Sequence, residues 1–281
     1  GWLETLDDAR LRSLVEKGLS NNRSLQAAAA NVDGARALVS QAAASLSPQV
    51  GASIGSSSGG PLEGSGSNLF NAGLQASWEV DLWGRIRSGN LAAQESFEAA
   101  KAEFEFAQQS LAANIAKSYF VVVEAQNQLD IARKSVEAIE ETNRIVEVQF
   151  ENGMADQQNV SLARSDLAGA REAFTTSEGA LRNAVRSLEL LLGRYPSAEL
   201  EVNAELPEVP QNVPAGLPSQ LLERRPDLIA AERQVAAAFN RLDQAKTANL
   251  PNFSLSGNLG GSSSSLSDVL NPANMAWQAI S

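Results

Sequence analysis

The chain has 281 residues, of which 43% are hydrophobic and 20% charged, and it contains neither cysteine nor histidine. Disulfides, thiol nucleophiles, histidine bases, Ser-His-Asp triads and the usual zinc sites are therefore excluded. The net charge of −11 argues against a nucleic-acid partner, because phosphate would be repelled.

Two segments in the first third of the chain alternate between apolar and polar residues, as a strand with one apolar and one polar face does. They cover Gln49 to Ser58 and Asn71 to Leu82, and Leu74, Trp78 and Val80 fall on the apolar face of the second. One interpretation is a small antiparallel sheet whose apolar face rests on helices. The other is membrane-spanning strands between lipid and a water-filled lumen. The pattern alone favours the first.

Two long helices are predicted next, from about 90 to 152 and from about 156 to 192, with apolar residues at alternating three- and four-residue steps. The short turn at Gly153 makes them antiparallel neighbours. A further helix, from about 21 to 46, precedes the strands. We expect it to lie end to end with the second long helix, along the first. The apolar seam of the second long helix consists of Val160, Ala163, Leu167, Ala170, Phe174, Ser177, Leu181, Ala184, Leu188 and Leu191.

An internal repeat links the first and last parts of the chain. Residues 25–53 and 228–256 match without gaps at one offset, 228 − 25 = 203, and both read as an alanine-rich helix, a proline and an alternating strand. The alternative is chance similarity between two alanine-rich helices. The identical pairs include Leu25/Leu228, Val32/Val235, Ala35/Ala238, Gln41/Gln244, Ala42/Ala245, Pro48/Pro251 and Ser53/Ser256.

The two copies of this repeat lead into segments of very different length. The first continues to a break at Arg194-Tyr195-Pro196, whereas the second has only 30 residues after Pro251 (281 − 251). We therefore expect the chain to stop inside its second unit, as a fragment without the fourth strand and the second helical hairpin.

Three motifs resemble those of the outer membrane efflux proteins, the TolC/OprM-like outer membrane factors. They are SWEVDLWGRIR at 77–87, VPAGLPSQLLERRPD at 213–227, and Gly1-Trp2 together with LSNNRSL at 19–25. The resemblance covers essentially the whole chain in the expected order. It points to the branch that serves RND multidrug pumps.

The resemblance implies a mainly α fold with a β-strand portion, TolC-like. A long helical hairpin would form part of a periplasmic α-barrel, and four strands per protomer would enter a transmembrane β-barrel shared by a homotrimer. It thereby reverses the preference between the two interpretations of the strands. Relatives are commonly anchored by an acylated N-terminal cysteine. This chain has none, so the resemblance implies a lipoprotein only through a residue upstream of Gly1.

The chain is divided accordingly. Equatorial segments are expected at 1–22 and 195–225, a first-repeat helix at 23–47, two barrel strands with their loop at 48–82, a coiled-coil hairpin at 88–193, a second-repeat helix at 226–249 and a truncated strand region at 250–281.

The tip of the hairpin is the first candidate site. In the family such tips meet the hairpin of a periplasmic adaptor, and glycine and small neighbours allow a tight reversal and a close approach. The structural alternative makes Gly153 a helix C-cap and Asp156 an N-cap. The predicted contact residues are Asn152, Gly153, Met154, Ala155 and Asp156.

The strand end holds the other candidates. Trp78 and Trp83 would form an aromatic belt at the membrane interface. Asp81 and Arg85, four residues apart, would pair or cap the long helix and serve structure rather than chemistry. No catalytic, cofactor-binding or metal-binding residue is predicted.

The predicted function is a passive exit duct, not an enzyme, in the Gram-negative outer membrane and extending into the periplasm. It would export drugs and small toxic compounds together with a periplasmic adaptor (membrane fusion protein) and an inner-membrane RND transporter, and its strands would contact outer-membrane lipid. The main alternative is a coiled-coil structural or scaffolding protein of the envelope. An adaptor is a second alternative, but no lipoyl-like segment flanks the hairpin.

Overall fold

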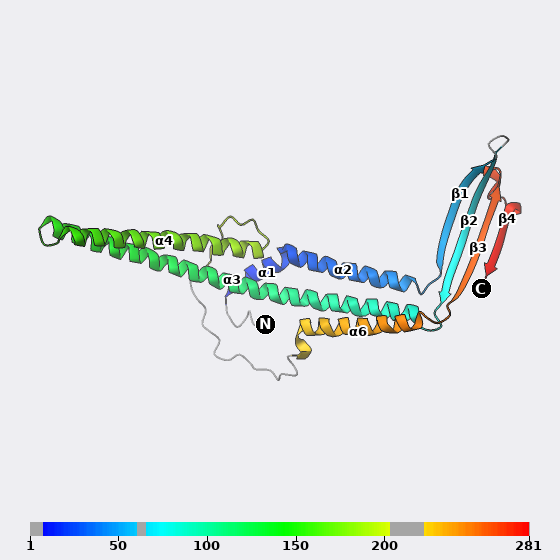
Figure 1. Cartoon of the computed structure of the whole chain (residues 1–281), viewed down its shortest axis with the longest axis horizontal. Coiled ribbons are helices and arrows are strands. Elements are labelled where there is room, and N and C mark those ends of the chain that lie inside the picture. Colours follow the sequence, from blue (N-terminus) through cyan, green and yellow to red (C-terminus); the bar gives the residue numbers. More distant parts are fainter. Residues whose placement is uncertain (1–7, 61–65, 203–221, 281) are drawn as a thin grey trace. The chain divides into compact units, whose positions relative to one another are not determined.

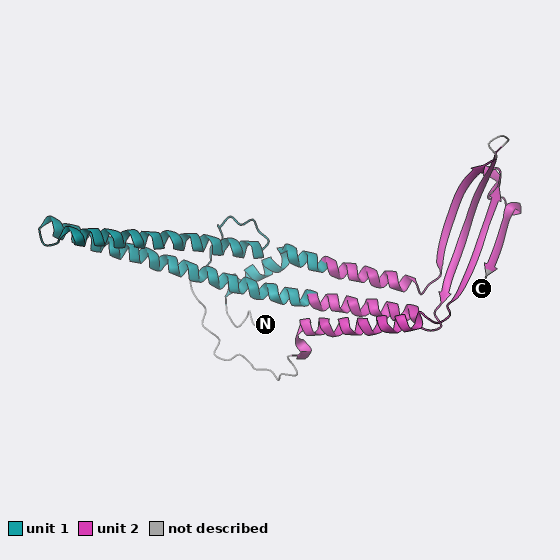
Figure 2. Cartoon of the chain, viewed as in Figure 1, with its two compact units in different colours: residues 1–29, 104–221 teal, residues 30–103, 222–281 magenta. Residues whose placement is uncertain are grey.

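The computed structural model describes residues 8–60, 66–202 and 222–280 (Figure 1). It divides into two compact units, one formed by residues 1–29 and 104–221 and the other by residues 30–103 and 222–281 (Figure 2). Parts of the predicted equatorial segments, and of the motifs that contain Gly1-Trp2 and Val213, lie outside the described residues. Among the described helices, none has a stretch both long enough and apolar enough to cross a membrane.

Helices make up most of the described chain. Two strands precede the longest helix, and two more lie near the C-terminal end. In chain order the longer elements are α1 (Ala9–Asn21), α2 (Arg23–Ala44), β1 (Gln49–Gly59), β2 (Ser67–Val80), α3 (Arg85–Glu151), α4 (Gln157–Leu191) and α6 (Pro226–Thr247). The C-terminal part adds β3 (Phe253–Ser263), two short 3-10 turns and β4 (Met275–Ile280). The 67-residue helix α3 is about 100 Å long at 1.5 Å per residue.

The first unit is built on a helical core. Side chains of α1, α3 and α4 pack together around Tyr119, Leu11, Ile115 and Leu188, all of which are fully buried. Every predicted seam position of α4 is buried or half-buried, so the three-and-four spacing identified the packed face correctly. Burial of these side chains accounts for the antiparallel pairing of α3 with α4, because an amphipathic helix is stabilised mainly by its packed face.

The end of α4 and the start of α2 meet at Asn22; the end-to-end course of the two helices stays a prediction. The Asn22 side chain caps α2 by accepting a hydrogen bond from the Leu25 N–H at 3.0 Å, and its amide donates to the carbonyl of Leu191 at 2.9 Å. The residue that starts one helix therefore satisfies a carbonyl that the end of the other leaves unpaired.

A glutamate holds the chain that leaves α4. Glu189 is fully buried, and its carboxylate accepts hydrogen bonds from the N–H groups of Ala198, Glu199 and Leu200 at 2.8–3.2 Å. Three backbone donors compensate the cost of burying this carboxylate.

The second unit contains a four-stranded antiparallel sheet in the order β1-β2-β3-β4. The prediction that the fourth strand is missing was wrong, because β4 pairs with β3 over residues 275–280. Its signal is present in the sequence: Gln278 and Ala279 follow Gln75 and Ala76 at the repeat offset of 203 (278 − 75). The repeat therefore extends beyond Ser256 into this strand.

The repeat is visible in the lengths of the elements. Helices α2 and α6 each have 22 residues and begin 203 residues apart (226 − 23). Strands β1 and β3 each have 11 residues. Equal helices followed by equal strands favour a duplicated unit over chance similarity.

Candidate functional site

The sheet has two chemically different faces, which follow from its register. Directly paired residues point to the same side, so Ala52, Leu74, Leu259 and Trp277 form one row across all four strands. The whole apolar face consists mainly of Val50, Ala52, Ile54, Phe70, Ala72, Leu74, Ala76, Trp78, Val80, Phe253, Leu255, Leu259, Met275, Trp277 and Ala279.

Helices of the described chain do not cover this apolar face. Ile54 is 80% exposed, Trp277 78% and Leu74 52%. A contiguous exposed apolar surface marks a contact with a membrane or with another protein. The interpretation that the apolar face rests on helices of the chain is therefore wrong.

The opposite face is polar and almost uncharged. It is formed mainly by serine, glycine, asparagine and glutamine, and among the described strands Glu79 is the only charged residue on either face. The alternation of apolar and polar positions thus continues through all four strands, as it does in strands that separate lipid from water.

The connection between β2 and α3 is fixed by two carboxylates. Asp81 caps α3: its carboxylate accepts hydrogen bonds from the N–H groups of Ile86 and Arg87, both at 3.0 Å, and from the Arg87 guanidinium at 3.2 Å. Burial would raise the pKa of Asp81, but these hydrogen bonds and the positive charge of Arg87 outweigh it and hold the pKa below its usual value.

Arg85 does not pair with Asp81 but with Glu79. Its Nε and Nη2 atoms contact the Glu79 carboxylate at 2.6–3.2 Å, and hydrogen bonding to Glu79 raises the pKa of the guanidinium. The sequence predicted that these residues pair with each other or cap the long helix. Asp81 forms the cap, whereas Arg85 forms its ion pair with Glu79 rather than with Asp81. The alternation of β2 places Glu79 on the polar face but gives no sign of this pair.

The two tryptophans at the strand end each bond to a link between a helix and a strand. The Trp78 indole N–H donates to the carbonyl of Leu46, between α2 and β1, at 3.0 Å. The Trp83 indole N–H donates to the carbonyl of Pro251, between α6 and β3, at 2.7 Å. Their placement in a membrane interface stays a prediction.

The tip of the α3–α4 hairpin is a tight reversal. Gly153 has φ +72°, a left-handed conformation that favours glycine, and a Cβ added there would meet nothing within 4 Å. Asp156 caps α4 by accepting from the Asn159 N–H at 2.8 Å. Met154 is 72% exposed, while Asn152 is exposed and Ala155 is half-buried.

Charged pairs join the two arms of the hairpin behind the tip. Arg164 contacts Glu147 at 3.1 Å and Arg171 contacts Glu140 at 2.7 Å. Among the described residues, no cluster of three or more carboxylates is placed to hold a metal ion.

A two-faced antiparallel sheet and a long helical hairpin in one chain define the class of outer-membrane channel proteins that combine a β-barrel with a helical barrel. The chain belongs to the outer membrane efflux protein family, whose model matches residues 14–194 and 217–280. It is accordingly a protein of the outer membrane with a periplasmic part.

Several individual proteins are similar to the chain. The cation efflux system protein CusC of Escherichia coli O6:H1 is 32% identical over 285 residues, which covers 100% of this chain and 62% of that protein. The probable outer membrane lipoprotein SilC of Salmonella typhimurium is 31% identical, covering 100% of this chain and 61% of SilC. The crystal structure of the Campylobacter jejuni CmeC outer membrane channel superposes with a TM-score of 0.89 at 26% identity, covering 100% of this chain and 62% of CmeC. The chain thus spans about six-tenths of the length of the curated relatives it matches.

Proposed function

We propose that the chain forms part of the passive outer-membrane exit duct of a tripartite efflux pump, which exports drugs and small toxic compounds. The observation that carries this proposal is the exposed apolar face of a sheet whose other face is polar and almost uncharged. Apolar side chains toward lipid and polar side chains toward water are what a channel wall requires.

The edges of the sheet support assembly with further copies. In the order β1-β2-β3-β4, one edge of β1 and one edge of β4 have no strand partner among the described residues. Unpaired strand edges are not stable in a bilayer, so a sheet there must close into a barrel. We propose that strands of other copies, in a homotrimer, complete this closure.

The partners follow from the same proposal. A periplasmic adaptor would contact the hairpin tip at residues 152–156, and an inner-membrane RND transporter would supply the energy. The exposed Met154 and the open space around Gly153 support this contact, because small or flexible side chains let another helix pair approach closely.

Conductance tests the duct itself. The protein expressed from its own gene, reconstituted in planar bilayers, should give discrete conductance steps. Expression in a host that lacks its own exit duct should restore resistance to toxic compounds. A protein that fractionates with the envelope, gives no conductance and restores no resistance would instead fit the scaffolding alternative.

A tip variant tests the adaptor contact. Met154→Asp places a charge on an exposed side chain without straining the backbone, so it should lower resistance while protein abundance and conductance are retained. Gln128→Asp is the matched control, because Gln128 is an exposed position on α3 away from the tip. Equal resistance in the two variants would contradict the contact.

A further inference from the structure

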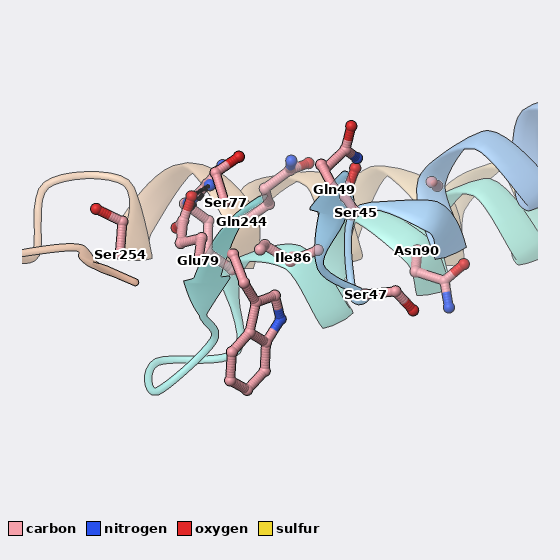
Figure 3. A pocket seen from close by; sticks show the side chains of 13 residues that line it. Ser45, Ser47, Gln49, Ser77, Glu79, Ile86, Asn90, Gln244 and Ser254 are labelled. Carbon is pink, nitrogen blue, oxygen red and sulfur yellow. Dashed lines mark hydrogen bonds and ion pairs between the residues drawn. The ribbon is translucent and has the colours of Figure 1, made fainter. Parts of the chain in front are cut away.

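A pocket of about 460 Å³ lies in the second unit, where β1 and β2 approach the ends of α2, α3 and α6 (Figure 3). Its walls carry four serine hydroxyls, three amide side chains, one indole and one ion pair. Pockets for small ligands have volumes of this order. The duct proposed above does not account for this pocket.

The charges in the pocket cancel. Glu79 and Arg85 are its only charged side chains, and both oxygens of the Glu79 carboxylate accept from the guanidinium at 2.6–3.2 Å. An anion or a cation would have to compete with this two-point ion pair. A neutral ligand would leave it intact.

The remaining polar groups suit a ligand that both donates and accepts hydrogen bonds. Hydroxyl and amide side chains do both. The Asn90 Oδ1 atom is buried and accepts no hydrogen bond from the described part of the chain. Even a water molecule does not reach this atom, so the groups that the lining offers to an occupant are its other hydroxyls and amides.

The indole supplies an apolar wall. The N–H of Trp78 is already donated to Leu46, so the pocket is left with its ring surface. An aromatic surface beside hydroxyls and amides fits a sugar, whose ring has apolar C–H faces and a rim of hydroxyls.

We propose that this pocket binds a neutral polyhydroxylated group the size of one or two sugar rings. Such a group could be supplied by an envelope glycan or by an exported glycoside, which share this chemistry. Binding does not depend on the duct function.

Titration calorimetry tests the proposal. The protein, purified in a detergent whose headgroup contains no sugar, would be titrated with maltose, with N,N′-diacetylchitobiose and with glucuronate. We expect saturable binding of at least one neutral disaccharide with a Kd of about 1 mM or tighter, and weaker binding of glucuronate. Preference for chitobiose would indicate an envelope glycan as the source. Preference for maltose, or equal binding of the two disaccharides, would indicate an exported glycoside.

Two variants reach the pocket from different sides. Asn90→Leu replaces one of the amide side chains of the lining with an apolar one. Gly89→Ala places a Cβ within 2.8 Å of the Gln244 amide nitrogen and so moves a lining side chain. Each should weaken sugar binding at least tenfold. Ser262→Ala is the matched control, because Ser262 is exposed on the same polar face but does not line the pocket.

Thermal unfolding and bilayer conductance complete the test. Wild-type unfolding temperature and conductance in Asn90→Leu, with binding lost, would separate this site from the duct function. The proposal is overturned if neither disaccharide binds saturably, if glucuronate binds more tightly than both, or if both pocket variants that fold as the wild type bind sugar unchanged.

Discussion

The two copies of the repeat agree in the lengths of the helix and of the first strand, and they differ in their polar contacts. Helices α2 and α6 have equal lengths, and so do strands β1 and β3. However, α6 contacts α3 through Arg233 and Glu95 at 3.1 Å and Gln234 and Glu103 at 2.6 Å. Helix α2 instead places the Arg36 guanidinium over the Phe97 ring at 5.6 Å.

This difference shows which features the two copies retain and which they do not. The lengths of the helix and of the first strand and the apolar face of the strands are held in common, since a shift of one residue would turn every apolar side chain to the other face. Exposed ion pairs contribute little to stability, so they are free to differ between the copies.

The largest expected effect tests whether the two copies are equivalent on the apolar face. Leu74 of the first copy and Leu259 of the second are register partners. Leu74→Arg and Leu259→Arg should each reduce the protein assembled in the outer membrane, because an arginine facing the bilayer midplane costs about 2–4 kcal/mol. Fractionation with quantitative immunoblotting measures this.

The next register pair provides the control. Gln75 and Asn258 are also partners but lie on the polar face, so Gln75→Arg and Asn258→Arg should leave assembly nearly unchanged. Equal losses for both faces would mean that the apolar face does not meet lipid.

A second prediction concerns the starts of the two helices. Asn22 and Arg225 occupy the same repeat position (225 − 22 = 203), but only Asn22 provides a side-chain cap. Asn22→Ala should destabilise the protein by about 1–3 kcal/mol, through the lost cap and the unpaired Leu191 carbonyl. Arg225→Ala should cost much less than Asn22→Ala, because it removes only an exposed ion pair with Asp227.

Chemical denaturation measures both variants, and a third one sharpens the comparison. Asn22→Asp keeps the acceptor for the Leu25 N–H but loses the donor to Leu191, so its stability should lie between wild type and Asn22→Ala. A loss as large as that of alanine would assign the whole effect to the Leu191 contact.

The two helix-to-strand links allow a third comparison. Trp78→Phe should cost about 1 kcal/mol through the lost hydrogen bond to Leu46. Trp83→Phe should cost less, because Trp83 is 49% exposed and water replaces its partner. In hydrogen exchange, Trp78→Phe should speed exchange of the Ser47 amide, and Trp83→Phe that of Leu250. The same response in both variants would contradict separate roles.

The smallest effect appears in acid, where Asp81 and Asp227 are compared. Hydrogen bonding to Arg225 lowers the pKa of Asp227, as backbone donors and Arg87 lower that of Asp81. A lowered pKa in the folded state contributes stability above the pKa of an unfolded aspartate, about 3.9. That contribution is lost as the pH falls through the folded-state pKa.

Salt distinguishes the two aspartates. Asp81 is mostly buried, with 11% of its side chain exposed, so wild type should lose more stability in acid than Asp81→Asn even in high salt. The corresponding difference for Asp227→Asn should disappear in salt, because exposed pairs are screened. Acid unfolding at low and high ionic strength measures this, and a salt-sensitive Asp81 effect would contradict its assignment as a buried cap.

Much of the fold could be predicted because it depends on periodicity. The seam of α4, the faces of β2 and the duplicated helix all repeat at fixed spacings that the chain displays directly. The Arg85–Glu79 pair could not be predicted in this way. The sequence suggested Asp81 as the partner of Arg85, because the two are four residues apart. That spacing brings side chains together only within a helix, and α3 begins at Arg85, after a turn in which Gly84 has φ +80°.

The pocket could not be predicted either. Its lining residues come from several elements, and Asn90 and Gln244 lie more than 150 residues apart in the sequence (244 − 90). Only the paired register of the sheet and the close approach of α3 to α6 bring them together. The position of the tip could be predicted from the break at Gly153 between the two helical patterns, whereas its contact with an adaptor came from the resemblance and stays a proposal.

The charged pairs of the hairpin have a consequence for its evolution. Glu140 and Glu147 are seven residues apart, and so are their partners Arg171 and Arg164. Removing or adding seven residues in each arm would therefore change the reach of the hairpin by about 10 Å while every side chain kept its facing neighbour. The arms can be adjusted to periplasms of different depth in whole heptads, and only insertions of other sizes would require the seam to be rebuilt.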